Sequence, residues 1–394
     1  MFSDKFGRHP AGLNPQWEAK LAMEASGQRI LDLTGSNPTA AGIPYPPEIP
    51  ALLNRESVLR YEPTPQGDPD ARAAISEYYS SRGRDCRPED LILTASTSEA
   101  YSYLFKLLCD PGDEILIPSP TYPLFDTLAE LENVELVRYP FMMREENAIP
   151  DRPDFDFLRS LISTRSKALI LVNPNNPTGH VCDGAEIRAY LDLAAEYDLA
   201  LIVDEVFCDY LLGNRPFLPI VSGGPMVFTL NGFSKLLGLP QMKLGWIHIG
   251  GETSKAGEAL EHLEWIADAF LSVNTPVQRA ARHLLALREP IQTGILHRLH
   301  ANLQAAEALI RGIRRIRWEK PDAGWYLILD VDAKVEDEAF ALELLKRHRV
   351  HVHAGSLFGF EEGCRLVLSL LGPEAEFRDG IGRIIAFVEE FSDA

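Results

Sequence analysis

The chain contains 394 residues, of which 38 are Lys or Arg and 57 are Asp or Glu, giving a formal charge of −19 at pH 7. Nucleic acids and membranes are not expected as partners, because nucleic acids and anionic membrane surfaces both require clustered basic side chains. The five cysteines are scattered and form no Cys-x-x-Cys pair, so neither a disulfide framework nor a metal site is expected from them.

The N-terminal sequence favours a cytoplasmic protein. The N-terminus lacks the basic stretch followed by an apolar stretch that is typical of an export signal. Apolar runs in the sequence are also shorter than the about 18 residues that a membrane span requires. Residues 1–45 are rich in Pro and Gly, with a helix expected at 16–26 and a short apolar run at 30–33. We expect this segment to form an arm and to contribute to a small domain.

Strands and helices alternate through residues 46–290, which we expect to form a large cofactor-binding domain. Amphipathic patterns predict helices at 68–82, 97–109, 253–271 and 277–287. Short runs rich in β-formers predict strands at 90–94, 114–118, 134–139, 167–172, 200–203, 227–230 and 244–249. Such alternation predicts an α/β fold with a mostly parallel, seven-stranded sheet flanked by helices.

The pattern changes in residues 291–394, for which we expect a smaller α+β domain completed by the N-terminal segment. A long helix at 296–313 is expected to bridge the two domains. Strands are expected at 326–331, 350–353 and 366–370, and helices at 336–349 and 373–390.

Three histidines in the middle of this segment have a spacing that suits a metal ion. His351 and His353 form a His-x-His pair, and His348 precedes them. No Cys or carboxylate completes the ligand set, so we expect a strand that exposes alternate histidines and no metal.

Three apolar runs of the large domain stop abruptly on polar residues. The first ends in an Asn-Pro-Asn-Asn-Pro-Thr-Gly segment that contains Asn176, the second ends at Asp204, and the third ends shortly before Lys235. Open α/β sheets bind ligands at the carboxyl ends of their strands. An amide, a carboxylate and an amine are therefore expected at one edge of the sheet.

Lys235 at this edge is suited to form a Schiff base. Such a lysine needs a desolvated site, and the adjoining chemistry needs an electron sink. If Asp204 faces a pyridine nitrogen, two unit charges ~4 Å apart attract by about 4 kcal/mol at an effective dielectric of 20. That energy corresponds to about three pKa units, enough to keep the pyridine protonated. The alternative for Asp204 alone is a helix N-cap.

The ordered set of motifs around Asn176, Asp204 and Ser234-Lys235 resembles the pyridoxal-phosphate-dependent enzymes of the class I and II aminotransferase family, which have fold type I. The resemblance spans nearly the whole chain and includes segments 33–38, 60–67, 93–100, 118–123 and 355–359. It implies an aminotransferase that moves an amino group between an L-amino acid and a 2-oxo acid through a lysine Schiff base. It also implies pyridoxal 5′-phosphate as cofactor and a homodimer as assembly.

The resemblance assigns roles around the cofactor ring. Lys235 holds the cofactor and then moves a proton between the substrate α-carbon and the cofactor. Asp204 pairs with the pyridine nitrogen, Asn176 donates to the ring hydroxyl oxygen, and Tyr122 stacks on the ring. The alternatives are a turn residue for Asn176 and a core aromatic for Tyr122.

The implied phosphate site is Ser96-Thr97-Ser98 at a helix N-terminus, where free amides and the helix dipole favour an anion. Simple helix capping is the alternative for these hydroxyls. Ser234 and Lys243 are further expected cofactor contacts. Tyr61 is expected to reach the phosphate of a neighbouring subunit, with an ordinary buried or interface tyrosine as its alternative.

Three positions near the cofactor depart from the family pattern. Phe207 replaces a tyrosine and cannot donate a hydrogen bond to the ring oxygen. Gly232 replaces a serine, and Lys243 replaces an arginine whose fork would bind phosphate in a bidentate way. We therefore expect the cofactor to be retained less tightly than is usual in the family.

The expected arginine for the substrate carboxylate is replaced by Val367. Arg365 lies two residues earlier on the same strand face, so it is a candidate substrate contact, together with Ser36 and Asn176. The alternative for Arg365 is a surface residue. These departures leave a pyridoxal-phosphate-dependent lyase, cyclase or oxidase as the alternative function; a non-enzymatic regulator is disfavoured because Asn176, Asp204 and Lys235 are intact.

Overall fold

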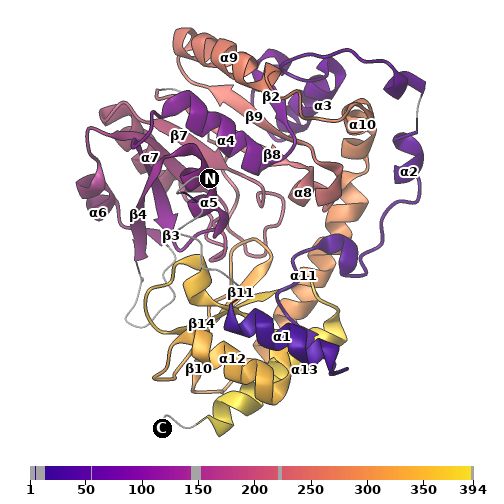
Figure 1. Cartoon of the computed structure of the whole chain (residues 1–394), viewed down its shortest axis with the longest axis vertical. Helices are drawn as coiled ribbons and strands as arrows, with labels where there is room; N and C mark the ends of the chain where they lie inside the picture. Colours follow the sequence, from indigo (N-terminus) through magenta and orange to yellow (C-terminus); the bar gives the residue numbers. More distant parts are fainter. Residues whose placement is uncertain (1–4, 6–13, 55, 143–151, 221–223, 392–394) are drawn as a thin grey trace.

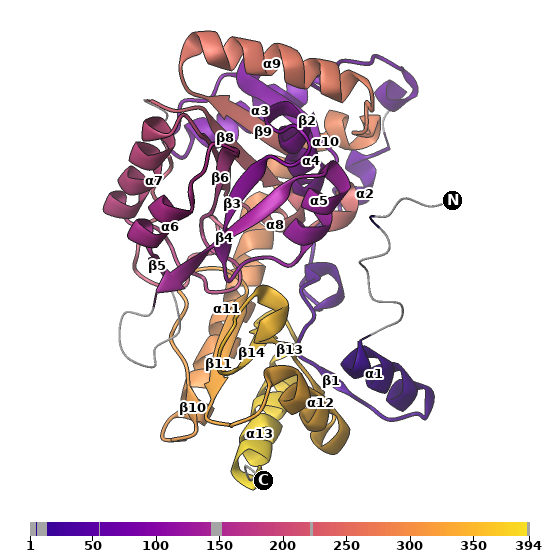
Figure 2. The same cartoon turned by 60° about the vertical axis from the view of Figure 1, so that its left-hand side comes forward.

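The computed structural model describes residues 5, 14–54, 56–142, 152–220 and 224–391, and Figures 1 and 2 show a larger region above a smaller one. The larger region is built on an eight-stranded sheet with the strand order β2-β9-β8-β7-β6-β3-β4-β5. The strands of this sheet are β2 (Leu91–Thr94), β3 (Glu114–Ser119), β4 (Glu135–Met142), β5 (Arg152–Pro153), β6 (Ser166–Val172), β7 (Ala200–Asp204), β8 (Val227–Gly232) and β9 (Gly245–Gly250).

The prediction of a mostly parallel sheet is confirmed. Strands β4, β3, β6, β7 and β8 run parallel to one another, whereas β9 is antiparallel to both β2 and β8. Seven strands match the predicted runs. The eighth, β5, pairs antiparallel with β4 and was missed because its two residues carry no periodic pattern.

Helices cover both faces of this sheet, because alternate residues of its buried strands point to opposite sides. Ile170 belongs to an apolar cluster with α4, whereas Leu169 and Leu171 belong to a separate cluster with α7. The helices of this region are α2 (Ile49–Leu52), α3 (Pro69–Ser80), α4 (Thr97–Leu108), α5 (Leu124–Glu132), α6 (Phe155–Leu161), α7 (Gly184–Glu196), α8 (Phe233–Leu236), α9 (Thr253–Asp268) and α10 (Thr275–Ala286). Short 3-10 helices occur at Pro38–Ala40, Glu56–Leu59, Pro88–Asp90, Pro240–Met242 and Gly355–Phe358.

The smaller region has an antiparallel four-stranded sheet with the order β10-β11-β14-β13. Its strands are β10 (Ile316–Arg317), β11 (Tyr326–Val331), β13 (His353–Ala354) and β14 (Cys364–Ser369). Its helices are α12 (Asp337–His348) and α13 (Glu374–Glu390). The long helix α11 (Arg288–Ile310) joins the two regions (Figure 1). It begins at Arg288 rather than at residue 296, so the predicted boundary at 290/291 falls within its first turn.

The N-terminal segment lies with the C-terminal part of the chain. Strand β1 (Leu31–Asp32) pairs in parallel with β12 (Val350–His351), and α1 (Pro15–Ala25) lies beside α12 (Figure 2). We therefore propose three parts. Residues 1–45 form an arm and part of the small domain, residues 46–290 form the large domain, and residues 291–394 form the C-terminal small domain.

The expected exposure of alternate histidines is wrong for His351. This side chain is buried, and its Nδ1 lies 3.3 Å from Asp32 Oδ1, because β1 covers β12. Within the described ranges, the helices do not combine the length and apolar character that a membrane span requires.

Candidate active site

The carboxyl ends of β6, β7 and β8 lie side by side. Val172 pairs with Asp204, and Asp204 pairs with Leu230. The loop carrying Asn176 follows β6, and Lys235 lies in the short helix α8 that follows β8. The fold thus brings the amide, the carboxylate and the amine to one edge of the sheet.

Asp204 is buried and oriented by two hydrogen bonds. Tyr101 from α4 donates to Oδ2 at 3.0 Å, and the Val206 amide donates to Oδ1 at 3.1 Å. Burial raises the pKa of Asp204 to about 6, while the hydrogen bonds from Val206 and Tyr101 act in the opposite direction. The carboxylate is therefore mostly ionised at neutral pH, and its desolvated charge carries a cost in free energy. Sequence reasoning missed Tyr101, because helical periodicity marks it only as core.

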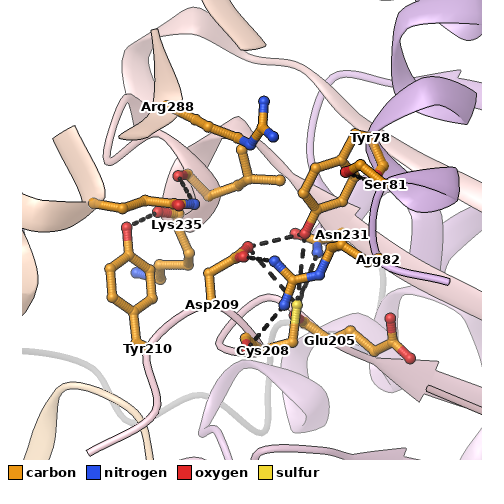
Figure 3. A network of polar contacts seen from close by, with 12 residues as sticks. Tyr78, Ser81, Arg82, Glu205, Cys208, Asp209, Tyr210, Asn231, Lys235 and Arg288 are labelled. Atoms are coloured by element: carbon orange, nitrogen blue, oxygen red, sulfur yellow. Dashed lines mark hydrogen bonds and ion pairs between the residues drawn. The ribbon is translucent and has the colours of Figure 1, made fainter. Parts of the chain in front are cut away.

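Lys235 lies in an aromatic environment. Its Nζ is 4.7 Å from the ring centroid of Trp325 and 5.6 Å from that of Phe207. Burial lowers the pKa of the amine to about 8, although the charge of Asp204 raises it. Tyr210 donates to the Lys235 carbonyl at 2.7 Å and fixes the backbone there (Figure 3). About a tenth of this amine is therefore unprotonated and nucleophilic at pH 7, far more than for an ordinary lysine.

The smaller region contributes two aromatic residues to the site. Trp325 is fully buried, and its ring meets Phe207 edge-on at 5.4 Å. The next residue, Tyr326, shares a hydrogen bond with Ser36, and the charge of Tyr122 adds to the burial that raises its pKa. The sequence analysis did not point to Tyr326 as a site residue.

Tyr122 has a half-open position. Its residue surface is 47% exposed, and Asp204 contributes, after burial, to raising the pKa of its hydroxyl. A ring that is partly exposed and electrostatically coupled to Asp204 suits a stacking residue better than a core aromatic.

Asn176 is buried in a tightly bonded loop. The Asn175 amide donates to the His180 carbonyl at 2.8 Å, and the Gly179 amide donates to the Asn175 carbonyl at 2.9 Å. The side-chain oxygen of Asn176 has no hydrogen-bond partner among the described residues. A buried polar atom left unpaired costs about 1–3 kcal/mol, so this amide fits a partner on a bound ligand.

The first turn of α4 combines capping with free amides. Ser96 is the N-cap and accepts from the Glu99 amide at 3.2 Å, while Glu99 accepts from the Ala95 amide at 2.6 Å. Thr97 and Ser98 follow at half-buried positions of the first turn. Ser96 therefore caps the helix, and the same turn retains the dipole that suits a phosphate.

Two glycines make room for this turn. A Cβ on Gly245 would lie 3.0 Å from the carbonyl carbon of Ser96 and 3.1 Å from the Thr97 nitrogen. A Cβ on Gly232 would lie 3.0 Å from the Gly245 Cα. Backbone therefore meets backbone here with no space for a side chain.

The substitution Gly245→Ala is expected to weaken binding of pyridoxal 5′-phosphate by about 5- to 100-fold, the equivalent of about 1–3 kcal/mol of overpacking. The added methyl displaces the first turn of α4. Titration of the cofactor-free chain, followed by fluorescence, measures the affinity. Gly257→Ala on α9 is the matched control, because its Cβ would meet nothing within 4 Å. Equal affinity in both variants would contradict a phosphate site at this turn.

The four remaining expected contacts, Ser234, Lys243, Tyr61 and Arg365, differ in how exposed they are. Ser234 is half-buried in α8, and Lys243 is exposed with a left-handed φ of 53°. Tyr61 is 76% exposed. Arg365 is buried, so the surface alternative is wrong for it.

Arg365 makes its described contacts within the smaller region. It hydrogen-bonds to the Glu362 carbonyl, lies 3.9 Å from Asp330, and stacks over Phe360 at 5.1 Å. The described contacts do not join it to Lys235. Val367 is buried between β11 and β13 and offers no charge.

A polar network behind the site fixes the segment that follows β7. Glu205 is buried and accepts from Arg84 at 2.8 Å. Asp209 accepts from Tyr78 at 2.9 Å and pairs with Arg82 (Figure 3). The partners come from α3 or the turn after it, and breaking a buried ion pair costs about 3–5 kcal/mol. The network therefore holds the strand end against α3.

The family model of class I and II aminotransferases matches residues 34–384. The chain belongs to the class I and II aminotransferase family. This aminotransferase is a transferase that depends on pyridoxal 5′-phosphate, as the family does.

Similar proteins match this aminotransferase over most of their length. The glutamate-pyruvate aminotransferase of Escherichia coli (strain K12) is 30% identical over 358 residues, which are 87% of this chain and 86% of that protein. The alanine aminotransferase of Mycobacterium tuberculosis (strain H37Rv) is 29% identical over 385 residues, which are 94% and 88% of the two chains. The solved alanine aminotransferase from Pyrococcus furiosus has a TM-score of 0.88 and 25% identity, covering 99% of this chain and 100% of that one.

The residues of this aminotransferase fit the family's cofactor. The buried carboxylate of Asp204 suits a protonated pyridine nitrogen, and the unpaired Oδ1 of Asn176 suits a hydrogen-bond donor on a bound ligand. Gly245 lets β9 pack closely against the first turn of α4, whose N-terminus suits a phosphate. The amine of Lys235 suits an aldehyde.

Proposed function

We propose that this aminotransferase moves an amino group between an L-amino acid and a 2-oxo acid through a Schiff base at Lys235. One observation carries the proposal: the half-buried amine of Lys235 lies at the same sheet edge as the buried carboxylate of Asp204, and desolvation lowers the pKa of the amine and raises that of the carboxylate. Desolvation and mutual charge shift pKa values in this way at sites that perform acid and base chemistry.

Bound pyridoxal 5′-phosphate supplies an electron sink for the charge that develops at the substrate α-carbon. Lys235 holds the cofactor and, once released, accepts and returns the α-proton at Nζ. Its lowered pKa suits this work, because an acid-base group is most effective near the working pH. Asp204 keeps a proton on the ring nitrogen.

Neighbouring side chains position these two groups. Tyr101 and the Val206 amide fix both oxygens of Asp204. Trp325 and Phe207 cover the Lys235 amine and exclude water from it. Phe207 cannot donate to the ring hydroxyl oxygen, so we assign that hydrogen bond to Asn176 and the stacking contact to Tyr122.

The phosphate is proposed to bind Ser96, Thr97 and Ser98, with Ser234 and Lys243 as further contacts. We propose a homodimer in which Tyr61 reaches the phosphate of the other subunit. Its 76% exposure in the single chain supports a role for this side chain outside its own core. We propose the cytoplasm as the compartment.

The activities named for the relatives suggest that this aminotransferase acts on small amino acids and 2-oxo acids. Those proteins are a glutamate-pyruvate aminotransferase and alanine aminotransferases, so we propose L-alanine or L-glutamate as donor and pyruvate as an acceptor. Ser36, hydrogen-bonded to Tyr326, is the proposed contact for the substrate carboxylate. Arg365 is not proposed for this role, because its described partners are Asp330, Glu362 and Phe360.

The half-reaction tests this function. Purified, cofactor-loaded protein is mixed with L-alanine or L-glutamate, and its visible spectrum is followed. We expect the absorption band of the bound cofactor to disappear and to return when a 2-oxo acid is added. Ammonia release without recovery of the band would instead identify a lyase. No visible band after addition of cofactor would contradict both reactions.

A further inference from the structure

Two buried side chains and one half-buried side chain with metal-binding atoms lie together next to the loop that carries Asn176. The ligand atoms of His180, Cys182 and Glu186 are all within 4.8 Å of one another, and this is the one such group of three or more in the part of the chain that the structure describes. His180 Nε2 lies 3.1 and 3.0 Å from the two Glu186 oxygens. The His180 and Glu186 side chains are 1% and 14% exposed, and Cys182 is 2% exposed.

We propose that His180, Cys182 and Glu186 bind a zinc ion that braces the Asn176 loop. Zinc binds thiolate, imidazole and carboxylate ligands at about 2.0–2.3 Å, so the ligand atoms of one tetrahedral ion are about 3.3–3.8 Å apart. The ligand atoms of the cluster lie within 4.8 Å of one another, so binding requires them to approach by up to about 1 Å. A thiolate ligand disfavours Mg²⁺ and Ca²⁺, which prefer oxygen.

A simple histidine-glutamate pair explains only part of this arrangement. That pair uses one ring nitrogen of His180, whereas Nδ1 is buried and has no hydrogen-bond partner among the described residues. A buried imidazole nitrogen with a free lone pair is itself a potential metal ligand. The cluster therefore contains a buried nitrogen, His180 Nδ1, that is available to bind a cation.

The charges around the cluster suit a divalent cation. A thiolate at Cys182 and a carboxylate at Glu186 together carry two negative charges. The nearby cation of Arg215 is already engaged, because it donates to the Val181 carbonyl at 2.7 Å and lies 3.4 Å from Asp322. Binding releases the Cys182 thiol proton to solvent, so the metal affinity increases with pH.

The cluster is connected directly to the cofactor-binding loop. The Cys182 amide donates to Asn173 Oδ1 at 3.0 Å, and the His180 carbonyl accepts from the Asn175 amide. Glu186 lies in the first turn of α7 and accepts from the Asp183 amide at 2.8 Å. An ion shared by these three ligands would join α7 to the segment after the loop, whose hydrogen bonds to Asn173 and Asn175 would then hold Asn176 in place. Three protein ligands leave one zinc position for water.

Cobalt substitution tests the site on the full chain freed of cofactor and metal. Co²⁺ bound to a thiolate gives a charge-transfer band in the near ultraviolet. We expect one equivalent per chain, displacement by Zn²⁺, loss of the band in Cys182→Ser, and at least about tenfold weaker binding in Glu186→Gln. Glutamine can still accept from the Asp183 amide, so the helix cap is retained in that variant.

Cys86→Ser is the matched control, because Cys86 is also buried but lies outside the cluster. It is expected to keep the full band. A wild-type chain without stoichiometric Co²⁺ binding, or a band that survives in Cys182→Ser, would overturn the proposal. Because the titration uses no cofactor and no substrate, its failure is separate from any failure of the proposed aminotransferase reaction.

Discussion

Replacing Lys235 with alanine is expected to lower the rate of amino transfer by at least about 10⁴-fold, because one amine acts as both the attachment point and the acid-base group. The loaded proteins are reduced with borohydride and digested, and the cofactor mass is located on the peptides. Wild type is expected to carry it on Lys235 and the variant nowhere. Lys243→Ala, which removes an exposed lysine nearby, is expected to keep covalent attachment. Attachment in Lys235→Ala would contradict the assignment.

The pH dependence of attachment gives a second measurement on the same amine. Burial lowers the pKa of Lys235 from 10.5 to about 8. Only the unprotonated amine attacks a carbonyl, so the rate of attachment to the cofactor-free chain should increase about tenfold per pH unit below 8 and level off above it. A rate that continues to increase up to pH 10 would show an ordinary, solvated lysine.

Replacing Asp204 with asparagine is expected to lower kcat/KM for L-alanine by about 10³-fold. The estimate follows from the attraction of about 4 kcal/mol between carboxylate and pyridinium, which the neutral amide lacks. Asparagine has the same size, its Oδ1 can accept from the Val206 amide, and its Nδ2 can donate to the Tyr101 hydroxyl, so both contacts can be kept. Asp198→Asn, at an exposed ion pair with Lys255, is the control and should keep full activity. A loss smaller than tenfold would exclude Asp204 as the partner of the ring nitrogen.

Both variants should make the cofactor-free protein more stable at pH 7, which separates lost chemistry from lost folding. The folded pKa of Asp204 is raised, so its contribution to stability is full below 3.8 and is lost as pH rises through about 6. The folded pKa of Lys235 is lowered, so its contribution is full above 10.5 and is lost as pH falls through about 8. At pH 7 both charges therefore oppose folding. Thermal unfolding should give a higher Tm for each variant.

The sequence predicted the strands and the three strand-end residues because both leave local signals. Buried parallel strands appear as short apolar runs, and a polar residue at the end of such a run is visible without tertiary information. Asn176, Asp204 and Lys235 were found in this way. Strand β5 was missed, since two residues carry no periodicity.

The missed residues depend on contacts between distant segments. Tyr101 meets Asp204 only because α4 crosses the sheet edge, and Tyr326 reaches Ser36 only because the smaller region folds back. His180 and Cys182 were missed for a different reason. Their spacing matches no common metal motif, and only the first turn of α7 brings Glu186 to them.

The contact between Gly232 and Gly245 restricts how this protein can evolve. A serine at position 232, usual in the family, would place its Cβ 3.0 Å from both the Gly245 Cα and the Leu244 carbonyl oxygen. Moving β9 away would relieve the clash but would separate Gly245 from the turn at Ser96. A serine at position 232 therefore needs the neighbouring backbone to shift by a few tenths of an ångström, and that shift would be passed to the turn at Ser96 through Gly245.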